Sequence, residues 1–352
     1  MRRKKEILLC LILSVAVLFT FTFSTSLTVY AEEPAAEEPS EETPDTPLRG
    51  FVVLDGRTYY YYENGEMAKG LTVIDNDTYY FGKTKGAMLT GLRTISGSTY
   101  YFGSDGKAQS GWKTIDGNKY YFRKGKALKN GLYKVGGNAC TFSRKGVLVR
   151  KVYKNRKAVC LTYDDGPSSN TKLILSTLKK NGGLATFFVV GNRISSYSDS
   201  FSAVVKAGNQ IGNHSWSHPY YNTMSSSAIS RQISRCNSKA ASYGASVTVC
   251  RTPGGFVSSS INSAVKMPII LWSIDTLDWK TQSSASTYSA VMNNVRDGDI
   301  ILMHDLYSAT ANASSRIIPA LVKKGYQLVT IDEMAMIKGV TLRPGKVYTS
   351  FR

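Results

Sequence analysis

A unit of about twenty residues recurs five times in this chain, and its copies begin at Gly50, Gly70, Gly91, Gly111 and Gly131. Each copy has an apolar run, a turn such as D-G, S-G or G-G, an aromatic run and a second glycine. Two short runs around such a turn predict a β-hairpin. Because a single hairpin is unstable, the repetition predicts a solenoid over residues 50–150 in which neighbouring hairpins stack.

Two segments before the repeats are typical of targeting and spacing rather than of a fold. Basic residues 2–5 precede an apolar run from Ile7 to Phe23, and a small-residue site follows at Ala31. This order predicts a signal peptide over residues 1–31, with an uncut membrane anchor as the alternative. Residues 32–49 are rich in Glu and Pro and predict a disordered acidic linker. We therefore expect a secreted protein with no stable membrane span after signal cleavage.

The charge of the remaining chain indicates a partner. The whole chain carries +19, of which residues 1–31 contribute +3 and residues 32–47 contribute −7, so residues 48–352 carry +23. So basic a surface favours binding to a polyanion. No nucleic-acid-binding motif accompanies the charge, which favours an anionic polymer of a cell wall over nucleic acid. We therefore expect the protein to be associated with the wall.

Four cysteines lie after the predicted signal peptide, at Cys140, Cys160, Cys236 and Cys250. Secretion would permit disulfides, and the spacing leaves their pairing open. The absence of a C-x-x-C pair argues against a cysteine zinc site.

The pattern changes in residues 151–352, where apolar strands alternate with helical segments. We expect strands at 158–163 and 184–190 and helices at 171–181 and 199–207. Further apolar runs occur at 247–250, 269–274, 299–303 and 327–329. Such alternation predicts β-α units and a parallel sheet, and about two hundred residues with six or more strands favour a barrel.

The chain has only three histidines, and they lie in two short motifs. His214 and His218 belong to H-S-W-S-H, and His304 belongs to I-L-M-H-D. On a helix, H-x-x-x-H would place two imidazoles one turn apart on one face, which suits a single metal ion. Asp164 and Asp165 form a pair of carboxylates in T-Y-D-D-G-P.

These residues share a position relative to the predicted strands. In a parallel α/β barrel, catalytic groups lie at the carboxyl ends of the strands. Each of the following residues comes directly after an apolar or extended segment: Asp164, Asp165, His214, Arg251, Asp275 and His304. The sequence therefore predicts that they meet on one rim.

Five motifs occur in order: T-Y-D-D-G-P, H-S-W-S-H, R-T-P-G-G, D-T-L-D-W and I-L-M-H-D. In these motifs, roughly residues 157–335 resemble the polysaccharide deacetylases, carbohydrate esterase family 4. The resemblance implies an α/β fold, an irregular (β/α) barrel. Residues 50–150 resemble the cell-wall-binding (choline- and glucan-binding) repeats of secreted Gram-positive proteins. Their G-W position holds tryptophan only at Trp112, and a quaternary ammonium cage needs several aromatic rings, so stacking on sugar rings is favoured.

The resemblance implies a divalent metal bound by Asp165, His214 and His218. This ligand set favours Zn²⁺. Two histidines and a carboxylate can also hold iron in oxygenases. A second free carboxylate, Asp164, favours hydrolysis instead.

The resemblance also implies acid–base roles. Asp164 would be the general base, oriented and kept ionised by Arg251. His304 would protonate the leaving amine, with Asp275 raising its pKa. Backbone N–H groups near Gly254 would stabilise an oxyanion together with the metal.

In the same way, the resemblance assigns Leu302 to the acetyl-methyl pocket and Trp279 to a groove wall. The third motif departs from the family pattern, because Thr252 and Gly254 replace a proline and an aromatic residue. This change predicts a more open groove wall.

The sequence thus predicts a hydrolase that removes N-acetyl groups from a cell-wall glycan, with peptidoglycan N-acetylglucosamine as substrate. The alternatives are a chitin deacetylase, a xylan O-acetyl esterase that uses the same groups on an ester, and a wall-binding protein without catalysis. The last would predict loss of the acid, base or metal-ligand residues, and all of these are present.

Overall fold

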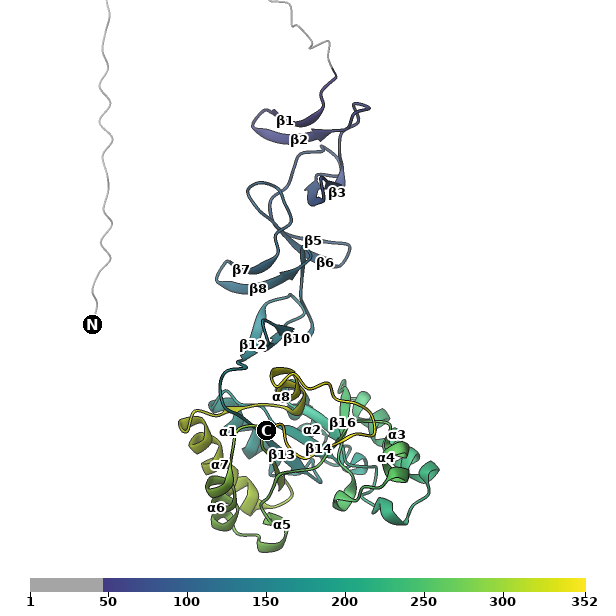
Figure 1. Ribbon diagram of the computed structural model, residues 1–352, viewed down its shortest axis with the longest axis vertical. Coiled ribbons are helices and arrows are strands. Elements are labelled where there is room, and N and C mark those ends of the chain that lie inside the picture. Colours follow the sequence, from purple (N-terminus) through teal and green to yellow (C-terminus); the bar gives the residue numbers. More distant parts are fainter. Residues whose placement is uncertain (1–46) are drawn as a thin grey trace, which may run out of the picture.

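The computed structural model describes residues 47–352, which form a column of hairpins standing on an α/β domain (Figure 1). The predicted signal peptide and all but the last residues of the predicted linker lie outside the described residues. Among residues 47–352, no helix has the length and apolar character needed to cross a membrane.

The repeats fold as antiparallel hairpins, as predicted from their turns. The first hairpin turns at Asp55 and Gly56, whose φ angles of 50° and 70° suit the type I′ geometry that joins two-residue hairpins. The strands of the repeats are β1 Gly50–Leu54, β2 Arg57–Tyr61, β3 Gly70–Ile74, β4 Asp77–Phe81, β5 Gly91–Ile95, β6 Ser98–Phe102, β7 Gly111–Ile115, β8 Asn118–Arg123, β9 Lys126–Ala127, β10 Gly131–Val135 and β11 Asn138–Phe142.

Aromatic rings hold successive hairpins together. In four of the five repeats a phenylalanine is buried at the end of the second strand or one residue before it: Phe81, Phe102, Phe122 and Phe142. The ring of Tyr80 packs on Phe102 of the next repeat with centroids 6.0 Å apart, and Tyr101 packs on Phe122 at 6.2 Å. Burying these rings between copies supplies the core that one hairpin lacks.

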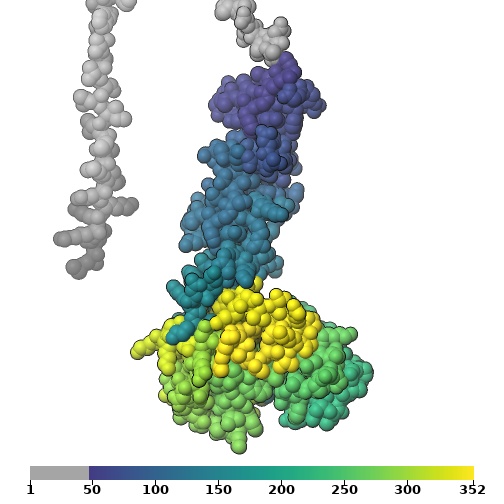
Figure 2. All heavy atoms as spheres, in the orientation of Figure 1, coloured from purple at the N-terminus to yellow at the C-terminus, as the bar shows by residue number. Residues whose placement is uncertain are grey.

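The fifth repeat is joined to the α/β domain by a third strand. Strand β12, Leu148–Val152, pairs with β11, so the predicted domain boundary between residues 150 and 151 falls inside a strand. Ala139 and Val152 share a buried cluster with Met334 and Ala335 of the C-terminal helix. In Figure 2 the last, teal repeat meets the yellow C-terminal residues at this junction.

The α/β domain is a parallel sheet of nine strands that curls into an irregular (β/α) barrel, and the predicted fold class is confirmed. The strand order is β18-β19-β13-β14-β15-β16-β17-β21, with β20 pairing β13 beside it. The strands are β13 Ala158–Asp164, β14 Thr186–Val189, β15 Gln210–Asn213, β16 Val247–Cys250, β17 Ile269–Ile270, β18 Ile274–Asp275, β19 Ile300–His304, β20 Gln327–Leu328 and β21 Val347–Tyr348. Every residue of β13 is buried, which agrees with its place between two neighbouring strands.

Helices cover the sheet and close the core. Apolar residues of β13, of β14 and of the helices that follow them form the main buried cluster. The helices are α1 Thr171–Lys180, α2 Ser198–Lys206, α3 Ser226–Ala241, α4 Ser259–Val265, α5 Asp278–Thr281, α6 Ser284–Asn294, α7 Ser308–Lys323 and α8 Ile331–Ile337. One expected apolar run, 269–274, is divided between two short strands, β17 and β18.

The four cysteines after the predicted signal peptide are buried, free thiols in the structure. None of the disulfides that secretion would permit is formed among them.

Candidate active site

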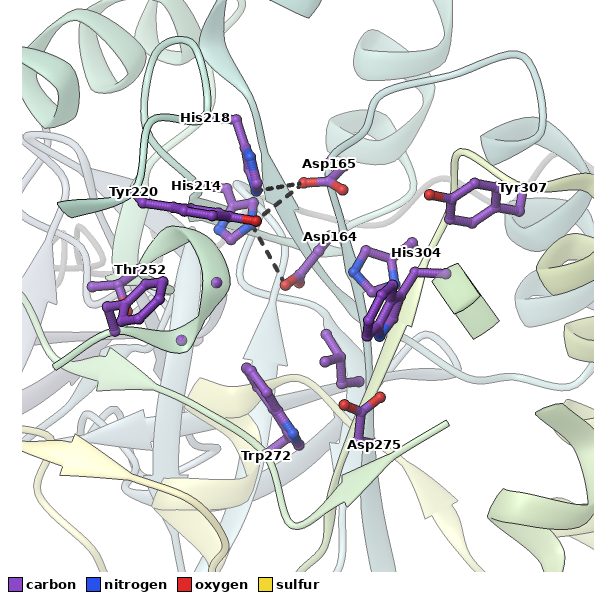
Figure 3. Close-up of a pocket in the computed structure, with 15 residues that line it drawn as sticks. Asp164, Asp165, His214, His218, Tyr220, Thr252, Trp272, Asp275, His304 and Tyr307 are labelled. Atoms are coloured by element: carbon purple, nitrogen blue, oxygen red, sulfur yellow. Dashed lines mark ion pairs between the residues drawn. The ribbon is translucent and has the colours of Figure 1, made fainter. Parts of the chain in front are cut away.

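A pocket of about 420 Å³ opens where the strands of the barrel end (Figure 3). Asp164 and His304 are the last residues of the adjacent strands β13 and β19 and lie opposite each other in register. His214 follows β15, and Arg251 follows β16. The carboxyl ends of parallel strands meet at one rim, which explains why residues far apart in sequence converge here.

Three side chains form a group suited to a metal ion. Oδ1 of Asp165 lies 3.4 Å from Nε2 of His214 and 3.2 Å from Nε2 of His218. Their ligand atoms all lie within 4.8 Å of one another. Within residues 47–352, Oδ1 of Asp165 is buried without a hydrogen-bond partner. A buried carboxylate oxygen facing two ring nitrogens fits a divalent cation, which would satisfy all three.

The hydrogen bonding of His214 also supports a site for a divalent cation. Its Nδ1 lies 2.7 Å from the Arg251 carbonyl, so this nitrogen donates and leaves the Nε2 lone pair directed towards Asp165. Burial lowers the pKa of His218, which keeps this second imidazole neutral. Burial raises the pKa of Asp165, but its interactions with the neighbouring imidazoles of His214, His218 and His304 outweigh burial and hold the pKa well below its usual range. The carboxylate is thus ionised and ready to bind a cation.

The H-x-x-x-H segment does not form a helix, so the expectation that His214 and His218 lie one helical turn apart is wrong. Ser215 and His218 adopt left-handed backbone conformations, with φ of 70° and 61°. Asn213 Oδ1 accepts from the Ser215 N–H at 2.7 Å, and Ser215 Oγ accepts from the His218 N–H at 2.8 Å. These side-chain bonds to the backbone replace helical ones and fold a tight loop that brings both imidazoles to Asp165.

Backbone strain is concentrated at the proposed ligands. Asp165, like His218, has a positive φ, 69°. Such conformations cost a non-glycine residue about 1–3 kcal/mol and persist where the surroundings and the function impose them. The strain is therefore consistent with a turn shaped for ligand geometry.

Arg251 fixes the second carboxylate, Asp164. Nη1 of this fully buried arginine donates to Asp164 Oδ1 at 2.7 Å and to Thr162 Oγ1 at 2.8 Å. Nε and Nη2 donate to the carbonyls of Ile270 and Leu271, both at 2.9 Å. With Oδ1 held in this way, Asp164 Oδ2 faces His214 Nε2 at 3.7 Å. One carboxylate oxygen is thus anchored, and the other is directed to the metal-ligand group.

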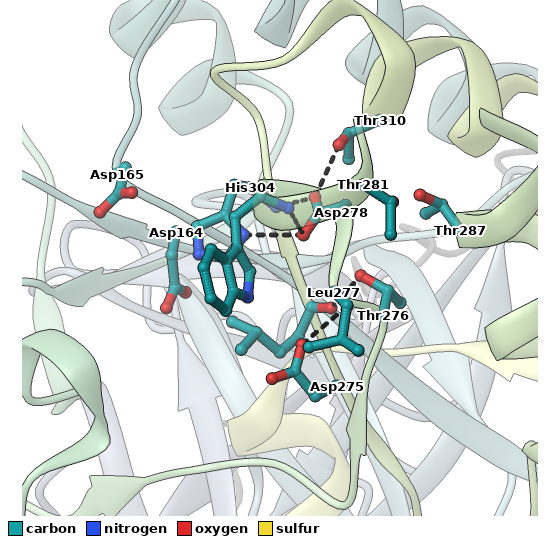
Figure 4. A network of polar contacts seen from close by, with 12 residues as sticks. Asp164, Asp165, Asp275, Thr276, Leu277, Asp278, Thr281, Thr287, His304 and Thr310 are labelled. Carbon is teal, nitrogen blue, oxygen red and sulfur yellow. Dashed lines mark hydrogen bonds and ion pairs between the residues drawn. The ribbon is translucent and has the colours of Figure 1, made fainter. Parts of the chain in front are cut away.

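Asp278, not Asp275, is the carboxylate that contacts His304, so the assignment of this role to Asp275 is wrong (Figure 4). His304 Nδ1 donates to Asp278 Oδ1 at 2.8 Å, and Asp278 Oδ2 accepts from the His304 N–H and from Thr310 Oγ1. Asp275 instead accepts from the Leu277 N–H at 2.9 Å while lining the pocket. Leu277, with φ of 52°, directs the chain into α5, so that Asp278 points inwards.

The contact with Asp278 determines how His304 titrates. Burial lowers its pKa, but the hydrogen bond to Asp278 and the charges of Asp164, Asp278 and Asp165 outweigh burial and raise the pKa to about 9. His304 is therefore protonated at neutral pH, and its Nε2 is free to donate into the pocket.

Asp305 supports the carboxylate turn and was not identified from the sequence. It is fully buried, its Oδ2 accepts from Thr171 Oγ1, and its carbonyl accepts from Ser168 Oγ at 2.6 Å. A Cβ at Gly166 would come within 2.2 Å of Asp305 Oδ1, so glycine is required for this close approach. The only sequence signal for Asp305 was its position next to His304, because the residues that it bonds to lie some 135 positions away in sequence.

The walls of the pocket are aromatic. Gly254, Trp279 and Leu302 all line it, as expected from the sequence. The wall that was predicted to be open is instead closed by the rings of Phe256 and Tyr220. Both rings pack against Gly254, and their centroids lie 5.3 Å from each other. Gly254 has φ of 67°, and a Cβ there would come within 2.8 Å of the Phe256 ring. Glycine thus lets Phe256 of the same loop and the more distant Tyr220 form this wall.

A thermal-shift experiment tests the metal group directly. We expect Zn²⁺ at about 100 times its Kd to stabilise residues 47–352 by about 2.7 kcal/mol, a rise of several degrees in Tm. The variant His218→Ala should lose this shift, because one of three ligands is removed. His304→Ala, which removes a pocket histidine outside the group, should keep it; equal loss in both variants would contradict the assignment.

Comparison with known proteins agrees with this geometry. Residues 151–269 match the family described as polysaccharide deacetylase, and residues 48–91 and 89–131 match the choline-binding repeat. The sequence-based resemblance of both parts is therefore confirmed.

Three relatives illustrate the similarity. The chain is 39% identical over 188 residues to the peptidoglycan-N-acetylmuramic acid deacetylase PdaC of Bacillus subtilis, covering 52% of this chain and 40% of that protein. It is 31% identical over 202 residues to a peptidoglycan-N-acetylglucosamine deacetylase of Bacillus cereus, covering 55% of this chain and 95% of that protein. A family 4 acetyl xylan esterase from Clostridium thermocellum, solved with a cobalt ion, superposes with a TM-score of 0.53 at 35% identity, covering 55% of this chain and 98% of the esterase.

Proposed function

The chain belongs to the polysaccharide deacetylase family, and on this basis we propose that it hydrolyses N-acetyl groups of a wall glycan, with peptidoglycan N-acetylglucosamine as substrate. One observation carries the proposal. Around one pocket, a free carboxylate oxygen of Asp164 and a protonated His304 accompany a group of three metal-ligand side chains. This combination of base, acid and metal site suits hydrolysis of an acyl group.

A divalent ion held by Asp165, His214 and His218 would act as a Lewis acid on the acetyl carbonyl and lower the pKa of water. Zn²⁺ is our choice, because two imidazoles and one carboxylate are ligands that zinc commonly takes in hydrolases. Ion identity is tested by metal analysis of the purified protein, in which another ion at one equivalent would contradict zinc.

The protein's own groups transfer two protons. Asp164 Oδ2 accepts a proton from the water that attacks the acetyl carbon, while Arg251 holds Oδ1 in place. His304 Nε2 then donates a proton to the sugar nitrogen as the carbon–nitrogen bond breaks, which yields acetate and an amine. Among residues 47–352, Gly254 N–H has no acceptor, whereas the Gly255 N–H is bonded to the Thr252 carbonyl at 2.9 Å. We therefore assign Gly254 N–H to the oxyanion.

The rim contributes to binding of the sugar. Leu302 offers an apolar contact for the acetyl methyl group at the bottom of the pocket. Trp279, with 47% of its surface exposed, and Tyr220, with 53% exposed, are placed to stack on sugar faces. Exposed rings around a polar pocket are what an extended, uncharged glycan requires.

We also propose that the enzyme acts outside the cell and bound to the wall, which the wall-binding repeats and the predicted signal peptide support. Sugar stacking remains our proposal for the repeats. The single tryptophan of the array, Trp112, has the ammonium of Lys151 over its ring at 5.5 Å, so the protein's own cation lies where a quaternary ammonium group would bind.

Ester hydrolysis is the second candidate, because an acetyl xylan esterase shares the fold. The protonated state of His304 favours the amide, since an amine must accept a proton in order to leave. Acetate release should be compared on N-acetylated peptidoglycan, chitooligosaccharides and O-acetylated xylan. Faster release from xylan would replace the first proposal with the second.

Replacing the base gives the sharpest test of catalysis. We expect Asp164→Asn to lower acetate release from N-acetylated peptidoglycan by about 10³-fold, because asparagine cannot accept the proton. Asp199→Asn, an identical change at an exposed position of α2, is the matched control and should retain full activity. Chelation should abolish activity, and Zn²⁺ should restore it. If wild type releases no acetate from any of the three substrates, a wall-binding protein without catalysis becomes the better proposal.

A further inference from the structure

Charge is distributed unevenly along the hairpin array. Residues 50–90 contain four basic and five acidic side chains, whereas residues 111–157 contain fourteen basic side chains and one acidic side chain, Asp116. In the structure, the second segment is the end of the column next to the catalytic domain (Figure 1). We call residues 111–157 the basic collar.

The second turn of each repeat makes the contrast visible at equivalent positions. These turns each contain a glycine with positive φ: Gly65, Gly86, Gly106, Gly125 and Gly146. Around Gly65 the side chains are Glu63 and Glu66, and around Gly125 they are Arg123, Lys124 and Lys126. The same backbone turn therefore presents two carboxylates at one end of the array and three cations in the collar.

The collar turn brings like charges together. Arg123 and Lys126 are direct partners in the antiparallel register of β8 and β9, and both side chains are exposed. Arg123 Nη2 also donates to the carbonyl of Lys134 in the next hairpin, at 3.2 Å. Like charges in direct opposition destabilise a sheet. The protein thus maintains two cations in direct opposition at this turn, at a cost to the stability of the sheet.

Carboxylates of the protein do not neutralise this charge. Within residues 47–352, only Arg150 among the fourteen basic side chains forms an ion pair, with Glu333. Several others rest on aromatic rings, such as Lys151 on Tyr153 at 4.9 Å and Lys157 on Tyr326 at 5.0 Å. Cations on rings remain charged and available at the surface.

From this geometry we infer that the basic collar binds a polymer of repeating phosphates, such as a polyol phosphate of the cell wall. A linear polyanion matches a column with cations spread over two hairpins and their junction, because each phosphate that docks releases counterions. The choice of a wall polymer as the source of phosphate rests on the proposed extracellular function. The catalytic pocket takes no part in this contact.

The test compares two triple charge reversals that change net charge equally. The collar variant carries Arg123→Glu, Lys124→Glu and Lys126→Glu, and the matched control carries Lys69→Glu, Lys83→Glu and Lys85→Glu, outside the collar. Fluorescence anisotropy with labelled poly(glycerol phosphate) gives the Kd of residues 47–352 at several salt concentrations. We expect the collar variant to bind at least about tenfold more weakly, with a shallower salt dependence, and the control to change by less than about twofold. An unchanged Tm of each variant shows that the hairpins remain folded.

Other results would overturn the inference. Equal weakening of both variants would mean that only net charge matters, and no weakening in either would remove the collar as a site. Tighter, collar-dependent binding of duplex DNA at equal phosphate concentration would assign the collar to nucleic acid. Acetate release from uncharged chitotetraose is measured separately, so failure of the proposed catalysis and failure of phosphate binding are distinguishable.

Discussion

Replacing Asp278 with asparagine is expected to lower kcat by about 10²–10³-fold and to shift the alkaline limb of the pH profile to lower pH. Asp278 contributes the hydrogen bond and a share of the charge that raise the pKa of His304 to about 9. The protonated imidazole is the active form, so activity falls as pH rises through this pKa. Without the carboxylate charge the pKa of His304 falls, and activity is lost from a lower pH.

Asp275→Asn is the matched control for this prediction. Asp275 lines the same pocket but bonds to the Leu277 N–H, so its loss should cost less than about tenfold and leave the alkaline limb in place. Because Asp278 is fully buried, the titration of the His304 ring should also be followed by NMR in each variant, which does not depend on turnover. A shifted limb in Asp275→Asn with none in Asp278→Asn would contradict the network in the structure.

A chain that starts at residue 151 is expected to aggregate or unfold, whereas a chain that starts at residue 131 is expected to fold. The first cut divides β12 and removes Arg150, which donates to Glu333 Oε1 at 2.7 Å and to the carbonyls of Gly182 and Leu328 at 2.8 Å. Glu333 is only 3% exposed, and breaking a buried pair by removing one partner costs about 3–5 kcal/mol. The cut also uncovers apolar residues of the junction.

A single substitution isolates the ion pair from the strand. Arg150→Met should lower the free energy of unfolding by about 3 kcal/mol in urea titrations. Arg144→Met, at an exposed arginine of the loop between β11 and β12, should change it by less than about 0.5 kcal/mol. Equal stability of the chains starting at 131 and 151 would show that the fifth repeat is independent of the barrel.

Periodic features were the easiest to predict from the sequence. The hairpins follow from turns such as Asp55-Gly56, because positive φ at both positions restricts the connection to one turn type. The strand at Ala158–Asp164 follows from a continuous apolar run, and the helix at Thr171–Lys180 from its spacing. In both elements the predicted bounds differ from the observed ones by a single residue.

Features that depend on side-chain bonds could not be predicted in this way. The loop that carries His214 and His218 is shaped by Asn213 and Ser215, whose bonds to the backbone override the helical spacing of the motif. Asp275 and Asp278 belong to the same D-T-L-D-W motif, and the left-handed conformation of Leu277 between them accompanies the turn that brings Asp278 rather than Asp275 to His304. Tertiary geometry, rather than residue type, separates the two.

One further consequence concerns strand β13, which begins at Ala158, directly after the collar, and ends at Asp164. Seven extended residues span roughly 23 Å, so the array joins one end of the barrel and the chemistry takes place at the other. Because Arg150 and Glu333 tie the last hairpin to the barrel, this interval is fixed rather than set by a flexible tether. When a wall polymer binds the collar, the catalytic pocket therefore lies at a constant distance from that polymer. The spacing between the bound polymer and the neighbouring glycan would then decide which sugars the pocket can reach.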